Sequence, residues 1–179
     1  MDAATLRDGI FALHTRRFGT VAEVMVRRLV KCGKGRSLSH DLYDDDQKHR
    51  IEVKFSRVQK RAKTPITEGT VLRRIEEATS ANRLVAFAEW QGLTFDSNIQ
   101  QIKKAEFEVL YYGLFFSDCI KIFRAKSGEI GPRIHYSDKQ HKGNVGEGQF
   151  HVNQDTLSIH LDTYLHQTLT YDRLLELLS

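Results

Sequence analysis

The stretch that decides the fold is residues 40–57, which read HDLYDDDQKHRIEVKFSR. From residue 50 onward, Ile51 and Val53 alternate with polar side chains, as expected of a half-buried strand. Residues 38–43 predict a shorter strand, and the polar run at residues 44–49 has the composition of a turn. The stretch therefore predicts a β-hairpin.

The alternation determines which side chains share a face of this hairpin. Glu52 and Lys54 lie on one face of their strand and Val53 on the other. If the hairpin closes near residues 45–48, Asp41 on the neighbouring strand approaches Glu52. Two carboxylates brought together repel each other and lose hydration, and a divalent cation relieves this repulsion. Mg²⁺ suits such a pair, because it takes one or two carboxylates together with water and phosphate oxygens.

This layout resembles the PD-(D/E)xK nuclease superfamily, specifically small type II restriction endonucleases. The matching residues are Asp41, Glu52 and Lys54, and His40 stands where the family usually has proline. Residues 98–123 and 136–151 extend the likeness over most of the chain. The resemblance implies Mg²⁺-dependent, sequence-specific hydrolysis of double-stranded DNA that leaves 5′-phosphates. It also implies a homodimer on a palindromic site, a companion DNA methyltransferase, Mn²⁺ as a substitute cofactor and Ca²⁺ supporting binding only.

The chemistry assigns a role to each residue of the motif. We expect Asp41 and Glu52, with the backbone carbonyl of Val53, to hold the metal. Lys54 would position the attacking water and stabilise the developing negative charge. Glu23 lies in a predicted helix before the hairpin and is a further candidate metal ligand. The alternative for the hairpin is an exposed strand of alternating charge, and for Glu23 a solvated helix charge.

The remaining patterns predict a mixed α/β fold, with a central mixed β-sheet flanked by helices, in one domain spanning residues 1–179. The resemblance makes this a restriction-endonuclease-like fold. Two helices are expected before residue 33, separated by a break at Gly19 and Thr20. A third is expected from Thr67. Strands are expected at residues 99–102, 107–116 and 119–123, a final helix at 171–178 capped by Thr170, and no clear element at 156–165.

Candidate DNA contacts fall into three groups of hydrogen-bond donors. A polar, glycine-containing segment at residues 133–151 predicts a recognition loop, because its side chains suit base edges and phosphates. A basic run after the catalytic strand suits phosphates. The third group is a pair of residues in a later strand. The three groups are Arg133, Lys139, Gln140, His141, Lys142, Asn144 and Gln149; Arg57, Lys60 and Arg61; and Gln101 and Lys103. The alternative for the loop is a flexible basic surface.

Composition limits the other classes. The chain has 40% hydrophobic and 28% charged residues, an ordinary globular balance. The net charge of +4 favours a polyanionic partner. Two distant cysteines, Cys32 and Cys119, exclude a disulfide scaffold and a cysteine-rich zinc site. There is no apolar stretch of membrane-spanning length and no secretory signal, so we expect a cytoplasmic protein, and the resemblance implies a prokaryotic one.

Three other functions stay open on the sequence alone. The chain could be a non-specific, repair or phage-type nuclease of the same fold, or an inactive DNA-binding module. Retention of all three motif residues argues against inactivity. The third is an HNH-type nuclease using His135, His141 and His160, but the spacing of these histidines is loose for the compact unit that such sites need.

Overall fold

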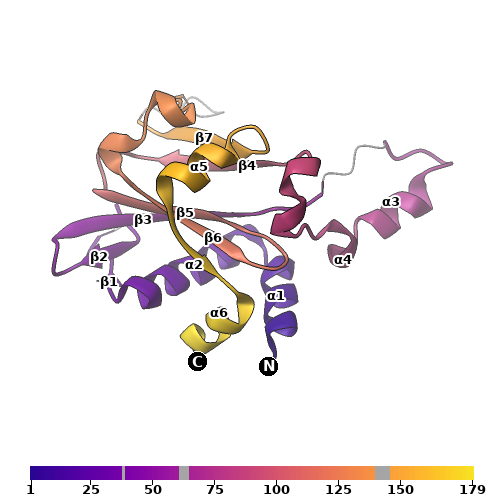
Figure 1. Ribbon diagram of the computed structural model, residues 1–179, viewed down its shortest axis with the longest axis horizontal. Coiled ribbons are helices and arrows are strands. Elements are labelled where there is room, and N and C mark those ends of the chain that lie inside the picture. Colours follow the sequence, from indigo (N-terminus) through magenta and orange to yellow (C-terminus); the bar gives the residue numbers. More distant parts are fainter. Residues whose placement is uncertain (38, 61–64, 140–145) are drawn as a thin grey trace.

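The computed structural model describes residues 1–37, 39–60, 65–139 and 146–179 (Figure 1). Its described helices are α1 (Ala3–Ala12), α2 (Thr15–Val30), α3 (Val71–Glu77), α4 (Ser80–Arg83), α5 (Leu157–Tyr164) and α6 (Tyr171–Leu178), with short 3₁₀ turns η1 (Phe87–Gly92), η2 (Ser127–Glu129) and η3 (Pro132–Ile134). Its strands are β1 (Gly33–Lys34), β2 (Leu42–Asp44), β3 (His49–Arg57), β4 (Asp96–Ile102), β5 (Val109–Phe115), β6 (Ile120–Lys126), β7 (Gly148–Asn153) and β8 (Leu165–Leu169). The predicted mixed α/β class is confirmed.

Six of the strands form one mixed sheet in the order β1-β2-β3-β5-β6-β8. Strands β3 and β5 run parallel, and every other neighbouring pair in this sheet is antiparallel. Strand β2 pairs with β3 so that Leu42 lies opposite Ile51 and Asp44 opposite His49. The hairpin therefore closes at residues 45–48, as the sequence predicted. Strands β4 and β7 form a separate antiparallel ribbon.

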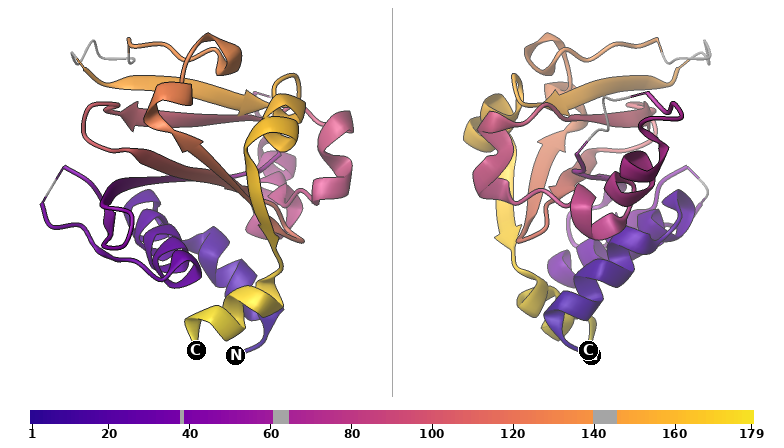
Figure 2. Two further views of the ribbon diagram at one scale, coloured as in Figure 1. Left: turned by 60° about the vertical axis from the view of Figure 1, so that its left-hand side comes forward. Right: turned by 90° about the vertical axis from the view of Figure 1, so that its right-hand side faces the viewer.

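Other elements lie against both faces of the large sheet (Figure 2). Helices α1, α2 and α6 cover one face, where Phe18, Met25 and Val53 belong to one apolar cluster. The β4–β7 ribbon and α5 cover the other, where Tyr112 and Phe150 belong to a second cluster. Because β5 has core on both sides, all of its residues are buried, which explains its continuous apolar sequence.

The predicted break at Gly19 and Thr20 is wrong. Helix α2 begins at Thr15 and runs through both residues, and the Thr20 hydroxyl donates to the Arg16 carbonyl oxygen at 3.3 Å within the helix. The chain breaks instead between α1 and α2. Helix α2 ends where Lys31 takes a left-handed conformation with φ of 56°, a common way to end a helix.

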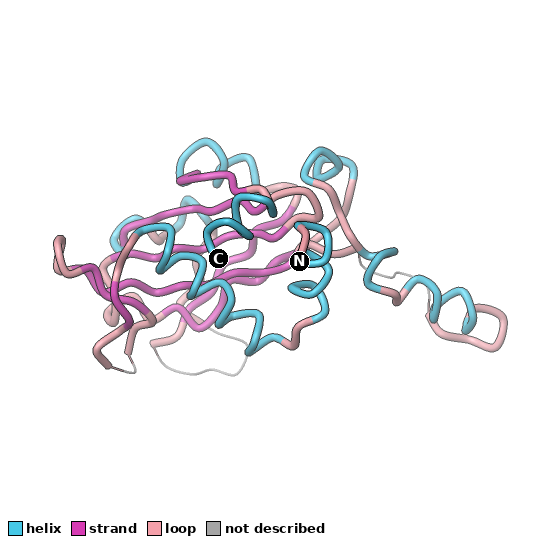
Figure 3. The backbone as a smooth tube through the Cα atoms, turned by 90° about the horizontal axis from the view of Figure 1, so that it is seen from below, coloured by secondary structure: helices cyan, strands magenta, loops and turns pink. Residues whose placement is uncertain are grey.

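The helix expected from Thr67 forms as α3 but begins only at Val71, and no residue in it is buried. Leu72 is 79% exposed and Ile75 is 63% exposed. Figures 1 and 3 show the reason: α3 lies away from both sheets, so its apolar side chains have no layer to pack against. Apolar spacing predicted the helix correctly, but its burial depended on where the connection placed it.

The C-terminal region resolves the ambiguity at residues 156–165. Helix α5 occupies most of this segment, and β8 follows directly as an edge strand of the large sheet. Helix α6 follows as predicted, and the Thr170 hydroxyl accepts a hydrogen bond from the Arg173 backbone N–H at 3.3 Å. Among the described residues, no helix combines the length and apolar character needed to cross a bilayer.

Candidate active site

Asp41 lies immediately before β2 and is held against β3 by two hydrogen bonds. Its backbone N–H donates to the Ile51 carbonyl oxygen at 3.1 Å. Its side-chain Oδ2 accepts from the backbone N–H of Val53 at 2.9 Å. The carboxylate thus occupies the place that a backbone carbonyl would take if β2 continued. The first motif residue is thereby fixed beside the strand that carries the other two.

The loop that precedes Asp41 is tightly folded around His40. The Gly35 backbone N–H donates to the Asp41 carbonyl oxygen at 2.8 Å, and a Cβ atom on Gly35 would lie only 2.1 Å from the His40 carbonyl oxygen. The His40 imidazole is buried, with Nδ1 3.0 Å from the Ser39 hydroxyl. His40, at the position where the resembling family has proline, therefore supports the loop that delivers Asp41.

Glu52 and Lys54 project from β3 on the face opposite to Val53, as the alternation predicted. Glu52 Oε1 and Lys54 Nζ are 2.5 Å apart, and their side chains are 12% and 26% exposed. Because both groups are largely removed from water, their charges interact strongly with each other and with the neighbouring carboxylates.

Burial raises the pKa of Glu52 to about 7, and the Asp41 and Glu106 carboxylates add to the rise while Lys54 opposes it. For Lys54, burial disfavours the charged form, but the carboxylates of Glu52, Asp41 and Glu23 outweigh it and raise the pKa of Lys54. The site therefore gathers more negative charge than one ammonium neutralises, which favours an added cation.

Asp41, Glu52 and Lys54 line one cavity of about 250 Å³. Its remaining wall includes Gln101 and Lys103, so these two predicted DNA contacts are brought to the motif residues. Gln101 has a φ of 60° and lies where the register shifts between Gln100 and Ile102. This bulge interrupts the regular alternation of β4 and allows Gln101 to face the cavity.

Glu23 approaches the site from α2, on the helical side of Asp41. Burial raises the pKa of Glu23, the Asp41 carboxylate adds to the rise, and Lys54 and Lys34 oppose it. Glu23, Lys34 and Asp41 line a second cavity of about 440 Å³, so Asp41 borders both cavities. The structure thus places Glu23 beside the motif, where a further metal ligand was expected.

The oxygen atoms at the site fit Mg²⁺ bound partly by water, rather than a metal ion bound entirely by protein side chains. No group of three His, Cys, Asp or Glu side chains in the described ranges is arranged to hold a metal ion. Mg²⁺ needs only one or two carboxylates besides water and substrate oxygens, and Asp41 and Glu52 supply these. The N–H and C=O of one strand residue point to the same edge. The Val53 carbonyl therefore lies on the Asp41 side and is a third oxygen donor.

Of the basic run after β3, Arg57 is engaged by the scaffold. Its Nη1 donates to the carbonyl oxygens of Phe11 at 2.7 Å and Leu13 at 2.6 Å, at the end of α1. Its guanidinium also lies over the Phe18 ring, 4.8 Å from the ring centre. Arg57 is therefore held by the scaffold, and its contact with DNA stays a prediction. Lys60 is exposed and remains available.

The predicted recognition loop at 133–151 is only partly described. Arg133 and Lys139 are exposed. Gln149 belongs to β7 rather than to a loop, and its Oε1 accepts from Asn98 Nδ2 at 2.9 Å. Gln140, His141, Lys142 and Asn144 lie outside the described residues, as does Arg61 from the basic run, so their roles stay predictions.

Two carboxylates that line the cavity were not predicted from the sequence. Glu106 precedes β5, and Glu147 precedes β7, and both line the cavity with the motif residues. Lys103 Nζ lies 3.6 Å from Glu106 and 4.0 Å from Glu147. The parallel pairing of β3 with β5 is what brings Glu106 to this edge. Recognising that pairing was the one signal that could have found it.

One of the three histidines proposed for the HNH alternative, His160, is not accessible. His160 is fully buried, its Nδ1 is 2.8 Å from the Tyr112 hydroxyl, and its ring stacks on Phe150. Burial lowers the pKa of His160 to about 4. A side chain in this position is inaccessible to metal and DNA. His135 is exposed, and His141 is outside the described residues.

Comparisons with known proteins identified no relative. No family model, no curated protein and no solved structure matches the chain. Function therefore has to be inferred from the geometry and chemistry of the site.

Proposed function

We propose that the chain is a Mg²⁺-dependent endonuclease that hydrolyses phosphodiester bonds of double-stranded DNA, with a restriction-endonuclease-like fold. One observation carries this proposal. Asp41, Glu52 and Lys54, the residues of the PD-(D/E)xK pattern, line one polar cavity, with Asp41 bonded to the backbone between the other two.

The residues of this cavity have different roles in the proposed reaction. Asp41, Glu52 and the Val53 carbonyl hold Mg²⁺, which when bound lowers the pKa of a coordinated water and neutralises charge on the phosphoryl group. Lys54 keeps its proton, orients the attacking water and donates to the developing negative charge. Gln101, which also lines the cavity, offers an amide donor to a phosphate oxygen.

The cavity favours a phosphodiester over a larger organic ligand. Its volume of about 250 Å³ is below the usual range for drug-sized ligands, and its lining is predominantly polar. Lys103 lies at this cavity and Lys34 at the adjoining one, and the whole chain carries a net charge of +4. Because the cavity also carries four carboxylates, a polyanion would place one phosphate there together with Mg²⁺, which offsets their charge.

The finer proposal is a type II restriction endonuclease. It rests on the resemblance of the motif and of the later strands, together with the donor-rich segment at 133–151. Cleavage at a specific site would leave 5′-phosphates. A two-fold homodimer would supply one site to each strand of a palindrome. A companion DNA methyltransferase, Mn²⁺ as a substitute, Ca²⁺ for binding only, and a prokaryotic cytoplasm belong to the same proposal.

The test is incubation of the purified chain with supercoiled plasmid DNA and Mg²⁺. Discrete linear fragments support site-specific cleavage, and a smear supports a non-specific nuclease of the same fold. Binding without cleavage indicates an inactive DNA-binding module. Full activity in excess chelator rejects the metal mechanism. Lys54→Ala should abolish cleavage, and Lys126→Ala, at an exposed lysine at the end of β6, is the matched control.

A further inference from the structure

The β4–β7 ribbon has two faces of different chemistry. Ile99, Phe150 and Val152 point inward and are buried in the core. The opposite side, here called the outer face of the ribbon, carries polar side chains only. Its members are Asp96, Asn98, Gln100, Gln149, His151 and Asn153. None of these six described residues is a lysine or an arginine.

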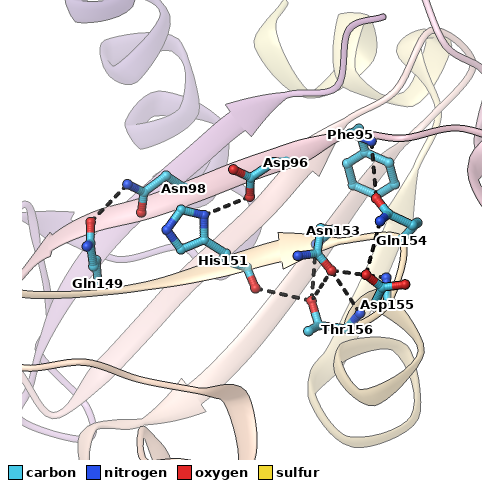
Figure 4. Close-up of polar contacts among 9 residues, drawn as sticks. All are labelled: Phe95, Asp96, Asn98, Gln149, His151, Asn153, Gln154, Asp155 and Thr156. Carbon is cyan, nitrogen blue, oxygen red and sulfur yellow. Dashed lines mark hydrogen bonds and ion pairs between the residues drawn. The ribbon is translucent and has the colours of Figure 1, made fainter. Parts of the chain in front are cut away.

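Two contacts order the outer face (Figure 4). Asp96 Oδ1 lies 2.7 Å from His151 Nδ1, and Asn98 Nδ2 donates to Gln149 Oε1 at 2.9 Å. A carboxylate bonded to Nδ1 fixes the orientation of the imidazole and directs Nε2 away from it. His151 is 45% exposed and Gln100 is also exposed. The face thus combines held side chains with groups that remain accessible.

The outer face continues directly into the candidate active site. Gln100 on this face immediately precedes Gln101, which the bulge turns to the cavity. On the other strand, Gln149 is two residues after Glu147, which also lines the cavity. Successive strand residues are about 3.3 Å apart. The end of the outer face at Gln100 and Gln149 therefore lies close to the cavity, and a duplex with one phosphodiester in the cavity would have this end within reach of a neighbouring groove.

Resting on the proposed nuclease function, we propose that the outer face of the ribbon reads base edges in a groove of the bound duplex, with Gln100 and His151 as the contacting side chains. A two-stranded ribbon fits the DNA major groove. Amide and imidazole groups both donate and accept hydrogen bonds, as the discrimination of base edges requires. Lysine and arginine, which supply most phosphate contacts, are absent from this face. Asp96 acts through His151 and is a positioning residue.

The test uses a library of DNA duplexes with a randomised central segment, cut with Mg²⁺ and sequenced at the new ends. Gln100→Ala and His151→Ala should each reduce discrimination against single-base changes by about tenfold or more at particular positions of the site. Asp96→Asn should relax the same positions as His151→Ala, because the imidazole loses its anchor. Gln47→Ala, at an exposed glutamine in the β2–β3 turn, should leave the preference unchanged.

Several outcomes would overturn this assignment. Variants that keep the full preference, or that lose cutting on every sequence in parallel, show that the face does not read bases. An unaltered chain that cuts without any preference keeps the nuclease proposal and rejects the reading surface. An unaltered chain that cuts nothing rejects both. Thermal unfolding verifies that each variant is folded, and Gln100→Glu, which keeps the side-chain size, replaces Gln100→Ala if that variant is unstable.

Discussion

The carboxylate of Asp41 accepts a hydrogen bond from the backbone N–H of Val53 at 2.9 Å, between the two other motif residues, Glu52 and Lys54. One side chain thus joins the start of β2 to the middle of β3 and contributes a carboxylate to the cavity. The Asp41 side chain therefore has two roles, a hydrogen bond that holds the hairpin and a negative charge in the cavity, and different substitutions remove one or both.

Replacement of Asp41 should separate its two roles. Asp41→Asn keeps an acceptor oxygen for the Val53 N–H but loses the negative charge, whereas Asp41→Ala loses both. Both variants should lose plasmid cleavage and bind Mn²⁺ more weakly. Only the alanine variant should also lose about 1 kcal/mol of unfolding free energy, because it leaves a part-buried N–H without its partner. Urea unfolding and titration with Mn²⁺ measure the two effects, and normal cleavage by Asp41→Asn would remove Asp41 from the mechanism.

Replacement of Lys54 should affect cleavage far more than DNA binding. Lys54→Ala removes a charge that acts mainly on the transition state, so cleavage should fall by about 10³-fold or more. Affinity for duplex DNA, measured by fluorescence anisotropy in Ca²⁺, should stay near that of the unaltered chain. Near-normal cleavage would reject the assignment of Lys54. A parallel loss of binding would mean that Lys54 contributes to holding DNA in the ground state.

Arg57 should contribute to stability rather than to DNA affinity. Its guanidinium donates to carbonyl oxygens at the end of α1, and hydrogen bonds of charged donors contribute roughly 1.5–3 kcal/mol each. Arg57→Ala should therefore reduce the unfolding free energy by about 3 kcal/mol, the lower end for two such bonds, and leave DNA affinity largely unchanged. Lys60→Ala, three residues later at an exposed site, should weaken DNA binding and leave the unfolding free energy largely unchanged. Weaker DNA binding by Arg57→Ala at unchanged stability would restore its predicted role.

The hairpin was predictable because its contacts are local. Period-two alternation placed Glu52 and Lys54 on one face, and a short turn in an antiparallel pair brings Asp41 back to the same strand. These relationships involve residues about a dozen positions apart, so composition and spacing contain enough information to recover them.

The contacts that the sequence did not reveal depend on distant elements. Arg57 and Lys60 belong to one basic run, but only the position of α1 beside the end of β3 separates their roles. Gln101 reaches the cavity through a one-residue bulge, which breaks the alternation from which strand faces are predicted. The exposed apolar residues of α3 show the same limit. The spacing of apolar residues predicts an apolar face on the helix, but it does not predict which other element packs against that face.

His160 should make the stability of the fold sensitive to acid. Burial lowers its pKa from 6.5 to about 4, so between these values the unfolded chain binds the proton more readily than the folded chain does. The stabilising contribution is complete above about pH 6.5 and is lost as the pH falls towards 4, with about 2 kcal/mol lost by pH 5. Urea unfolding at pH 7.5 and pH 5 should show this loss. His160→Gln should show a smaller difference between the two pH values, and an equal difference would assign the acid sensitivity to other groups.

Gly35 should be required for activity because of the space around it rather than because of its own chemistry. A Cβ atom at this position would lie 2.1 Å from the His40 carbonyl oxygen and 3.1 Å from that of Asp41. Gly35→Ala must therefore displace the segment that carries Asp41, and small misplacements of reacting groups cost about 10²-fold in rate. Gly33→Ala is the matched control, two residues earlier, where the nearest atom would be 3.6 Å from the new Cβ. We expect Gly35→Ala to lose plasmid cleavage by about that factor while it keeps a cooperative unfolding transition, and Gly33→Ala to cleave normally. Equal cleavage by both variants would show that the loop before Asp41 adjusts without moving the carboxylate.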